Sequence, residues 1–200
     1  MCFLQTIAYS LSKSSEGKRM TITTKRMVLR PWKESDAESL YEYAKDDRVG
    51  PIAGWPVHQN IDESLQVIRE VFMRPHIFAI TLKGEDKAIG LIGYLVGKDA
   101  NFAIGDNDGE ISYWIGVPYW GQGLVPEATK SIIDYGFKDM ALDNLWCGYY
   151  ADNEQSHKVQ AKCGFQYHST EENIRNPVMN DYRTKYITRL TKDEWFAKTG

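Results

Sequence analysis

A glycine-bearing turn between a strand and a helix carries the strongest chemical signal in this sequence. The turn reads WGQG at residues 120–123, after an apolar run over 109–117 and before a helical pattern that starts near residue 125. Such a turn leaves backbone N–H groups unpaired at the start of a helix, where the helix dipole favours an anion. Glycine also lets ligand oxygens approach the main chain closely. The spacing therefore predicts a phosphate site whose donors are the N–H groups of residues 122–125.

Spacing alone leaves two further roles open for this turn. A dinucleotide fingerprint G-x-G-x-x-G could use Gly121 and Gly123, but its third glycine would fall at Pro126, which has no N–H. Asp143 lies at about the distance expected of a ribose ligand, yet it precedes its strand instead of ending it. The turn could also serve only to join a strand to a helix. A Walker-type loop is excluded, because no Gly-Lys-Ser/Thr precedes the helix.

Charge and cysteine content exclude several classes of protein. The 200 residues include 24 Lys and Arg against 27 Asp and Glu, and this net charge of −3 provides no field for a nucleic-acid backbone. No run approaches the ~18 to 20 apolar residues of a membrane span. Cys2, Cys147 and Cys163 are odd in number and widely spaced, which predicts no disulfide framework and a cytoplasmic protein. We expect no metal site, since no CxxC or HxxxH pair occurs.

The hydrophobic pattern predicts one mixed α/β domain over residues 20–195. Strands are expected at 27–30, 78–82, 87–96, 109–117, 145–150, 165–169 and 183–190. Helices are expected at 33–45, 62–74, 125–140 and 153–163. Gly164 should end the last helix as a left-handed cap, and 49–60 should form a loop. Residues 1–19 are interpreted as a loosely held extension and 196–200 as a short tail.

Four stretches of the sequence together resemble the GNAT superfamily of acetyl-CoA-dependent N-acetyltransferases. Within it they are similar to the RimJ/RimL-like branch, the ribosomal-protein alanine N-acetyltransferases. In family order the stretches are 26–32 with 35–37, 111–116, 119–128 and 153–165. The resemblance covers about residues 20–195. It implies an α/β fold with a twisted, mostly antiparallel sheet, one splayed pair of parallel strands, and helices on either side.

The resemblance also implies acetyl-CoA as the acetyl donor and places residues around it. The superfamily's pyrophosphate loop, Q/R-x-x-G-x-G/A, has Trp120 and Val125 here at its first and last places. The pantetheine arm would pair with the exposed edge of the strand at 114–117, and Asn153 would bind that arm. The donor-binding residues implied in this way are Trp114, Ile115, Val117, Gln122, Gly123, Leu124, Val125, Asn153 and Ser156.

Two residues are expected to take part in the chemistry. Glu110, at the start of the strand that would reach the acetyl group, is the first choice of base for the ammonium proton. A solvated strand-end carboxylate is its alternative interpretation, and Asp152 is a weaker choice of base. Many members of the superfamily place a tyrosine acid where this chain has Gln160. The resemblance therefore suggests that Ser156 hydrogen-bonds the departing sulfur.

The sequence offers no activated nucleophile, because Cys147 lies in an apolar strand and is interpreted as a small core residue. We therefore expect direct acetyl transfer to a primary amine in a ternary complex. The branch resemblance suggests a protein N-terminus as acceptor, and a small amine fits the sequence equally well. Trp55, His58 and Tyr150 are the expected acceptor contacts. A non-catalytic acyl-CoA sensor and a dinucleotide-dependent enzyme remain alternatives, and either a monomer or a homodimer fits.

Overall fold

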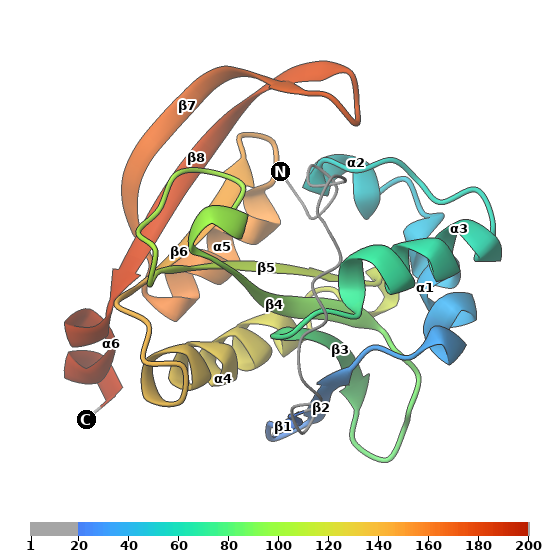
Figure 1. Cartoon of the computed structure of the whole chain (residues 1–200), viewed down its shortest axis with the longest axis horizontal. Coiled ribbons are helices and arrows are strands. Elements are labelled where there is room, and N and C mark those ends of the chain that lie inside the picture. The colour runs from blue at the N-terminus through green and yellow to red at the C-terminus, as the bar shows by residue number, and fades with distance from the viewer. Residues whose placement is uncertain (1–19, 200) are drawn as a thin grey trace.

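An eight-stranded sheet organises the chain, with the strand order β1-β2-β3-β4-β5-β6-β8-β7 (Figure 1). The computed structural model describes residues 20–199. Its strands are β1 (Ile22–Thr23), β2 (Met27–Pro31), β3 (Ile77–Leu82), β4 (Gly90–Val96), β5 (Gly109–Ile115), β6 (Asn144–Tyr150), β7 (Gln166–Asn176) and β8 (Asp181–Thr191). Neighbouring strands are antiparallel except β5 and β6, which are parallel. The predicted fold class, a mostly antiparallel mixed sheet with one parallel pair, is confirmed.

The parallel strands β5 and β6 separate almost as soon as they meet. Their ladder consists of the pairs Gly109–Leu145 and Glu110–Trp146, whereas β5 stays in register with β4 along its whole length. On its other side β6 is in register with β8 from Asn144 onward. Each strand therefore follows its antiparallel partner, and a gap opens between β5 and β6 beyond Glu110.

One face of the sheet is covered by the first helices of the chain (Figure 1). These are α1 (Ala37–Ala44) and α3 (Ile61–Val67), which lie at the right of Figure 1. On this face Trp114 of β5 packs against Trp32 and Trp55, with ring centroids 6.4 and 6.1 Å apart. These three buried indoles form the centre of the core beneath the first helices.

The opposite face carries α4 (Leu124–Lys138) and α5 (Glu154–Cys163). The Tyr94 hydroxyl of β4 donates to the Ile132 carbonyl of α4, and the Tyr113 hydroxyl of β5 lies within hydrogen-bond distance of the Ser156 carbonyl and hydroxyl of α5. Both helices lie close to their predicted ranges. Gly164 ends α5 with a left-handed φ of 92°, as the sequence predicts.

A one-turn helix, α2 (Gly50–Ala53), lies inside the segment predicted to be a loop. Pro51 stands in its first turn, and Gly54 ends it with a φ of 92°. A single turn is too short to produce helical periodicity in the sequence, which is why the pattern does not reveal it.

Three further elements differ in length from the prediction. The second predicted helix corresponds to α3, which ends at Val67. The chain then continues as a π-helical turn over Ile68–Phe72, and the apolar side chains of this turn are buried. The last two strands are longer than predicted, because β7 and the outer part of β8 have polar side chains that do not alternate with apolar ones. The terminal helix α6 (Lys192–Thr199) passes the predicted domain end at Trp195, and the predicted extension 1–19 lies outside the described residues.

The β7–β8 hairpin reaches across to α2 (Figure 1). Asn176 Nδ2 donates to the carbonyl of Gly54 at 2.9 Å, and Arg183 Nη1 donates to the carbonyl of Pro51 at 2.7 Å. The Arg183 guanidinium also lies 4.8 Å above the ring of Tyr150 in β6. We call these contacts the α2–hairpin bridge. They connect the two halves of the sheet on either side of the β5–β6 gap.

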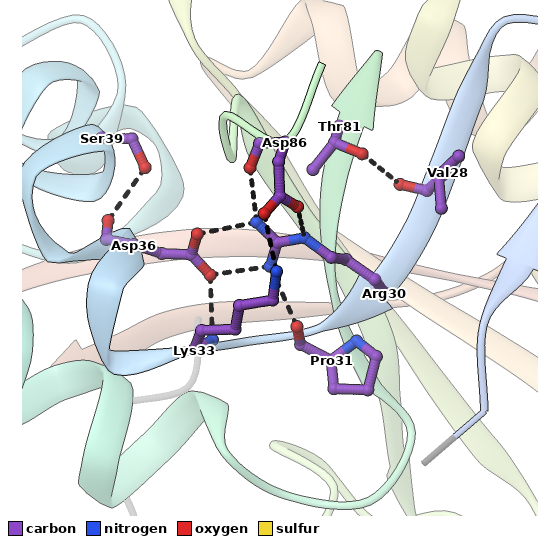
Figure 2. A network of polar contacts seen from close by, with 8 residues as sticks. All are labelled: Val28, Arg30, Pro31, Lys33, Asp36, Ser39, Thr81 and Asp86. Atoms are coloured by element: carbon purple, nitrogen blue, oxygen red, sulfur yellow. Dashed lines mark hydrogen bonds and ion pairs between the residues drawn. The ribbon is translucent and has the colours of Figure 1, made fainter. Parts of the chain in front are cut away.

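Arg30 of β2 ties three segments together at one edge of the fold (Figure 2). Its Nη1 and Nη2 donate to the two carboxylate oxygens of Asp36 at 2.8 and 2.7 Å, and its Nε donates to Asp86 Oδ1 at 2.6 Å. The two remaining N–H groups reach the carbonyls of Pro31 and Asp86 at 3.0 and 2.6 Å. All five guanidinium donors thus have an acceptor, as a buried arginine requires.

Asp36→Ala should destabilise the protein far more than Asp86→Ala. The side chains of Asp36 and Arg30 are 6 and 9% exposed, whereas that of Asp86 is 70% exposed. Loss of Asp36 leaves a buried guanidinium without its charge partner, which costs about 3 to 5 kcal/mol. Water can replace the exposed carboxylate, so its loss should cost about 1 kcal/mol or less. Urea unfolding followed by circular dichroism measures both values, and equal losses would contradict the assigned roles.

Candidate active site

The glycine turn opens onto solvent at the start of α4. Gly121 and Gly123 have φ values of 73° and 71°, and a Cβ at Gly121 would meet nothing within 4 Å. Gly123 is the N-cap of α4 and supplies no side-chain cap. Within residues 20–199, no hydrogen bond engages the backbone N–H groups of 122–125. The turn therefore presents a set of main-chain donors at the positive end of a long helix, which suits an anion.

A contact between the first strands and α4 holds this turn in place. Glu127 Oε1 accepts from the Thr24 hydroxyl at 2.7 Å and from the Arg26 backbone N–H at 2.8 Å, and its Oε2 accepts from Arg26 Nε at 2.7 Å. Arg26 Nη1 donates to the carbonyl of Gln122 at 2.9 Å. A guanidinium therefore lies beside the turn. Sequence reasoning missed this role, because the partners are about a hundred residues apart.

The edge of β5 that faces the gap offers main-chain hydrogen-bonding groups. The bonds from Gly116 N to Ile89 O and from Gly97 N to Asp108 O show that even-numbered residues of β5 bond to β4. Odd-numbered residues therefore direct their N–H and C=O groups into the gap. The Ile115 carbonyl accepts the Trp120 indole N–H at 2.9 Å, whereas the N–H and C=O of Tyr113 lie beyond the end of the β6 ladder. These are groups that an extended amide-bearing ligand can pair with.

Two cavities occupy the gap. The loop-side cavity, of about 100 Å³, is lined in part by Trp114, Ile115 and Val125. The strand-base cavity, of about 50 Å³, is lined in part by Glu110 and Tyr150. Four residues line both, so the cavities meet there: Ala53, Tyr113, Asn153 and Ser156. The two cavities therefore adjoin along the gap, one beside Trp120 and Val125 at the glycine turn and the other at the base of β5. We call this pair of adjoining cavities the cleft.

Other predicted site residues lie around this cleft without lining either cavity. Val117 is half-buried in the turn after β5, and the Leu124 side chain is buried beneath the start of α4. The Gln122 side chain donates to the carbonyl of Pro118 at 2.9 Å, so its backbone N–H is the group available at the turn.

Trp55 and His58, predicted as acceptor contacts, are both buried in the core at 5% exposure. Their rings lie 5.5 Å apart, and His58 Nδ1 lies 2.8 Å from the hydroxyl of Ser64. Burial lowers the pKa of His58 below its ordinary value. Neither side chain lines either of these two cavities, whereas Ile52 and Ala53 of the neighbouring α2 do. The predicted loop therefore reaches the cleft through α2.

Glu110 is a buried carboxylate, 3% exposed, at the base of the gap. It accepts hydrogen bonds from the backbone N–H of Asn101 at 2.6 Å and from Asn101 Nδ2 at 3.0 and 3.1 Å. Burial raises its pKa, while the Asn101 bonds and the charge of buried Lys185 oppose that rise. A carboxylate with a raised pKa is suited to accept a proton near neutral pH. The alternative of a solvated strand-end carboxylate does not match this burial.

The start of α5 faces the cleft from the β6 side. Asn153 is the N-cap, and its Oδ1 accepts from the backbone N–H of Ser156 at 3.0 Å. The Ser156 hydroxyl lies 3.0 Å from Tyr113 Oη and 3.1 Å from Gln160 Nε2. Asp152, the weaker choice of base, is exposed in the turn before the helix.

Cys147 lies against the strand-base cavity but is not poised as a nucleophile. Its Sγ donates to the carbonyl of Ile111 at 3.2 Å, and burial raises the pKa of the thiol well above its ordinary value. A nucleophilic cysteine needs the thiolate form. The described chain therefore gives no support to an acyl-cysteine intermediate here.

Comparison with known proteins decides the family. Residues 26–166 match the family described as Acetyltransferase (GNAT) domain. The chain belongs to the GNAT acetyltransferase family. It is accordingly an acyltransferase that uses acetyl-CoA as its donor. This assignment excludes the alternative that the glycine turn binds a dinucleotide.

Relatives of this GNAT domain are found in sequence and in structure. The Uncharacterized N-acetyltransferase YnaD of Bacillus subtilis (strain 168) is 27% identical over 176 residues, 88% of this chain and 99% of the relative. The fold is similar to a GNAT-family acetyltransferase from Bacillus anthracis, with a TM-score of 0.76 and 22% identity over 87% of this chain and 99% of that one. It is also similar to Mycobacterium smegmatis RimJ in complex with CoA-disulfide, with a TM-score of 0.71 and 20% identity over 88% and 89% of the two chains.

The residues of this GNAT domain fit an acetyl-CoA donor. The free N–H groups of 122–125 suit a pyrophosphate, the unpaired edge of β5 suits the amides of a pantetheine arm, and the cleft continues to Ser156 and Glu110. Sequence reasoning missed Asn101 and Tyr113, which hold these two side chains. Side chains alternate along β5, so Tyr113 lies on the opposite face of the strand from Glu110. This alternation was the signal in the sequence that could have identified Tyr113.

Gly123→Val should raise the KM for acetyl-CoA, because a branched side chain at a φ of 71° is strained and would cover the N–H cluster. Gly84→Val is the matched control, since Gly84 has a φ of 84° in the turn between β3 and β4 and a Cβ there meets nothing within 4 Å. Both variants carry similar strain, about 1 to 2 kcal/mol. Steady-state kinetics should show a raised KM only for the Gly123 variant. An unchanged KM would remove the turn from the donor site.

Proposed function

We propose that this GNAT domain transfers the acetyl group of acetyl-CoA directly to a primary amine in a ternary complex. The observation that carries the proposal is the pair of adjoining cavities that lies between the main-chain donors of the glycine turn and the buried carboxylate of Glu110. One end of the cleft suits an anionic donor, and the other end has a base. The Ser156 hydroxyl lies between them, where the cavities meet.

On the donor side, the proposed ligands are the residues around the loop-side cavity and the turn. The N–H groups of 122–125 hold the pyrophosphate, Asn153 and the β5 edge hold the pantetheine arm, and the Ile115 N–H polarises the thioester carbonyl. When bound, acetyl-CoA supplies an activated acyl group and a thiolate leaving group. A fixed N–H aimed at the oxygen where charge develops stabilises the transition state more than the ground state.

On the acceptor side, Glu110 is the proposed base. Asn101 fixes the carboxylate with three hydrogen bonds, and its raised pKa favours uptake of the ammonium proton. Tyr150 lines the same cavity and is the proposed acceptor contact from β6, while Trp55 and His58 support α2 from behind. The α2–hairpin bridge crosses the gap above Tyr150, so a slender acceptor suits the site best.

A protein N-terminus is one such slender acceptor, and a small amine is the other. The first follows from the RimJ/RimL-like sequence pattern and is supported by the fold likeness to Mycobacterium smegmatis RimJ.

We propose residues 20–195 as the catalytic unit, supported by the bond from Trp195 Nε1 to Asp134 Oδ1 of α4 at 2.9 Å. We propose a cytoplasmic protein. In the described part of the chain no helix is long and apolar enough to cross a membrane.

The first test combines donor binding with an acceptor panel. Titration calorimetry with CoA should show binding, and thiol release from acetyl-CoA should accelerate with a peptide that has a free N-terminus or with a small amine. The same peptide with a blocked N-terminus is the matched control. Binding without turnover on peptides, polyamines, amino acids and aminoglycosides would favour a non-catalytic acyl-CoA sensor, and absence of CoA binding would refute the proposal.

Glu110→Gln should lower kcat about 100-fold or more at neutral pH, because the amide cannot accept the ammonium proton. Since burial raises the pKa of Glu110 above 4.5, wild-type kcat/KM should fall as the pH drops through that raised pKa. The variant should lack this acid limb and retain only the dependence set by the amine. Asp152→Asn, at an exposed position, should keep both rate and profile. An acid limb that persists in the Glu110 variant would assign the base elsewhere.

A further inference from the structure

A buried polar cluster joins α5 to the strands behind it at the point where the two cavities meet. Its centre is the hydroxyl of Ser156, a residue that is 9% exposed. Tyr113 Oη lies 3.0 Å from Ser156 Oγ, and Gln160 Nε2 lies 3.1 Å from it. Behind them Thr188 Oγ1 of β8 donates to Gln160 Oε1 at 2.7 Å. Residues of β5 and α5 therefore contact the serine hydroxyl directly, and β8 holds Gln160 from behind.

The Gln160 amide has a defined orientation. Its Oε1 accepts the Thr188 hydroxyl, and its Nε2 faces both Ser156 Oγ and, at 3.5 Å, the carbonyl of Gly148. A flipped amide would place its oxygen against that carbonyl oxygen, so that two acceptors would face each other. Gln160 is 1% exposed, and water cannot relieve such a mismatch. Gln160 is therefore a fixed donor to Ser156.

Tyr113 is the second donor. Burial raises the pKa of its phenol well above the ordinary value, so the hydroxyl keeps its proton through the neutral range. Its oxygen lies 3.0 Å from Ser156 Oγ and 3.2 Å from the Ser156 carbonyl oxygen. Of these two acceptors Oγ is the nearer, and we assign the phenol proton to it.

A serine hydroxyl has two acceptor lone pairs and one proton. When Tyr113 and Gln160 both donate to Ser156 Oγ, the lone pairs are used and the proton points into the cleft. We propose that Tyr113 and Gln160 are positioning residues that aim the Ser156 O–H at the sulfur of the acyl donor. This inference rests on the proposed function, which puts the thioester beside Ser156.

The geometry stabilises the leaving group without an acid. As the amine attacks, the carbon–sulfur bond breaks and its electron pair stays on sulfur. The Ser156 O–H donates to that sulfur, and the two bonds that Ser156 accepts polarise its hydroxyl and strengthen the donation. Its proton stays on serine, and the departing thiolate is protonated by water, since an ordinary thiol has a pKa of about 8.5. Gln160 thus acts in a different way from a tyrosine acid at the same position.

The test measures the pKa of the CoA thiol when CoA is bound, by ultraviolet thiolate absorbance across pH, with the apoprotein subtracted. This readout needs neither acceptor nor turnover. In the wild type the bound thiol should titrate below about 8.5. Ser156→Ala should raise that pKa by about one unit or more, the value of a lost hydrogen bond to a charged group. Tyr113→Phe and Gln160→Met should each raise it by a smaller amount.

A double-mutant cycle separates positioning from direct contact. Because Tyr113 acts through Ser156, adding Tyr113→Phe to Ser156→Ala should cause no further shift. Tyr94→Phe is the matched control, since the Tyr94 hydroxyl is also buried and donates to the Ile132 carbonyl, away from both cavities. It should leave the bound thiol pKa at the wild-type value. In turnover, Tyr113→Phe should lower kcat and leave the KM for acetyl-CoA unchanged.

The other ionisable groups near the cleft do not obscure the result. Glu110 lines the strand-base cavity and is retained in every variant. Burial raises the pKa of Cys147 well above its ordinary value and that of Cys163 to about 11. A full Tyr113 shift in the Ser156→Ala background, or no shift in any variant that binds CoA, would overturn this inference alone. If the protein binds no CoA, the proposed function fails and this inference fails with it.

Discussion

The early end of the β5–β6 ladder is the constraint on which the rest of the site depends. Buried main-chain N–H and C=O groups need partners, and a strand whose neighbour turns away must find them outside the sheet. Beyond Glu110, the edge of β5 meets this need in part from side chains: the Cys147 thiol bonds to Ile111 and the Trp120 indole bonds to Ile115. The stretch between them remains for a ligand with its own amides. In this sense an extended donor completes the sheet.

The gap must also be prevented from closing, and several parts of the fold share this task. β6 is in register with β8 along its whole length, which draws it away from β5. The start of α5 fills the space between the strands, and the Tyr113 hydroxyl anchors it from the β5 side. On the other face, the α2–hairpin bridge sets the distance between the two halves of the sheet. The proposed binding and catalytic groups are thus held in place by the fold itself, which reduces the cost of ordering them when a ligand binds.

The sequence predicted the parts of this fold that depend on local patterns. The strand before the turn, the helix after it and the Gly164 cap each follow from a few neighbouring residues. It did not predict α2, because one turn carries no period, or the contact of Arg26 with Glu127, because tertiary packing alone joins them. The sequence predicts Trp55 and His58 as acceptor contacts, but aromatic packing buries them both. The sequence showed that position 160 is a glutamine and not a tyrosine. It did not show that Tyr113 lies near Gln160 in the fold, because tertiary packing alone brings them together.

The position of β8 in the sheet bears on how the protein is made. β8 lies between β6 and β7, although it is the last strand of the described chain. A chain leaves the ribosome N-terminus first, and a domain folds as a unit. Until Asp181–Thr191 have emerged, β6 is paired on one side only, through its two ladder pairs with β5. Its other edge is unpaired, and an unpaired edge is prone to pair with other chains. Gln160 also lacks Thr188 at that stage. An unfinished chain therefore contains most of the residues of the candidate site, but the site is not assembled. The insertion of β8 completes both the sheet and the site.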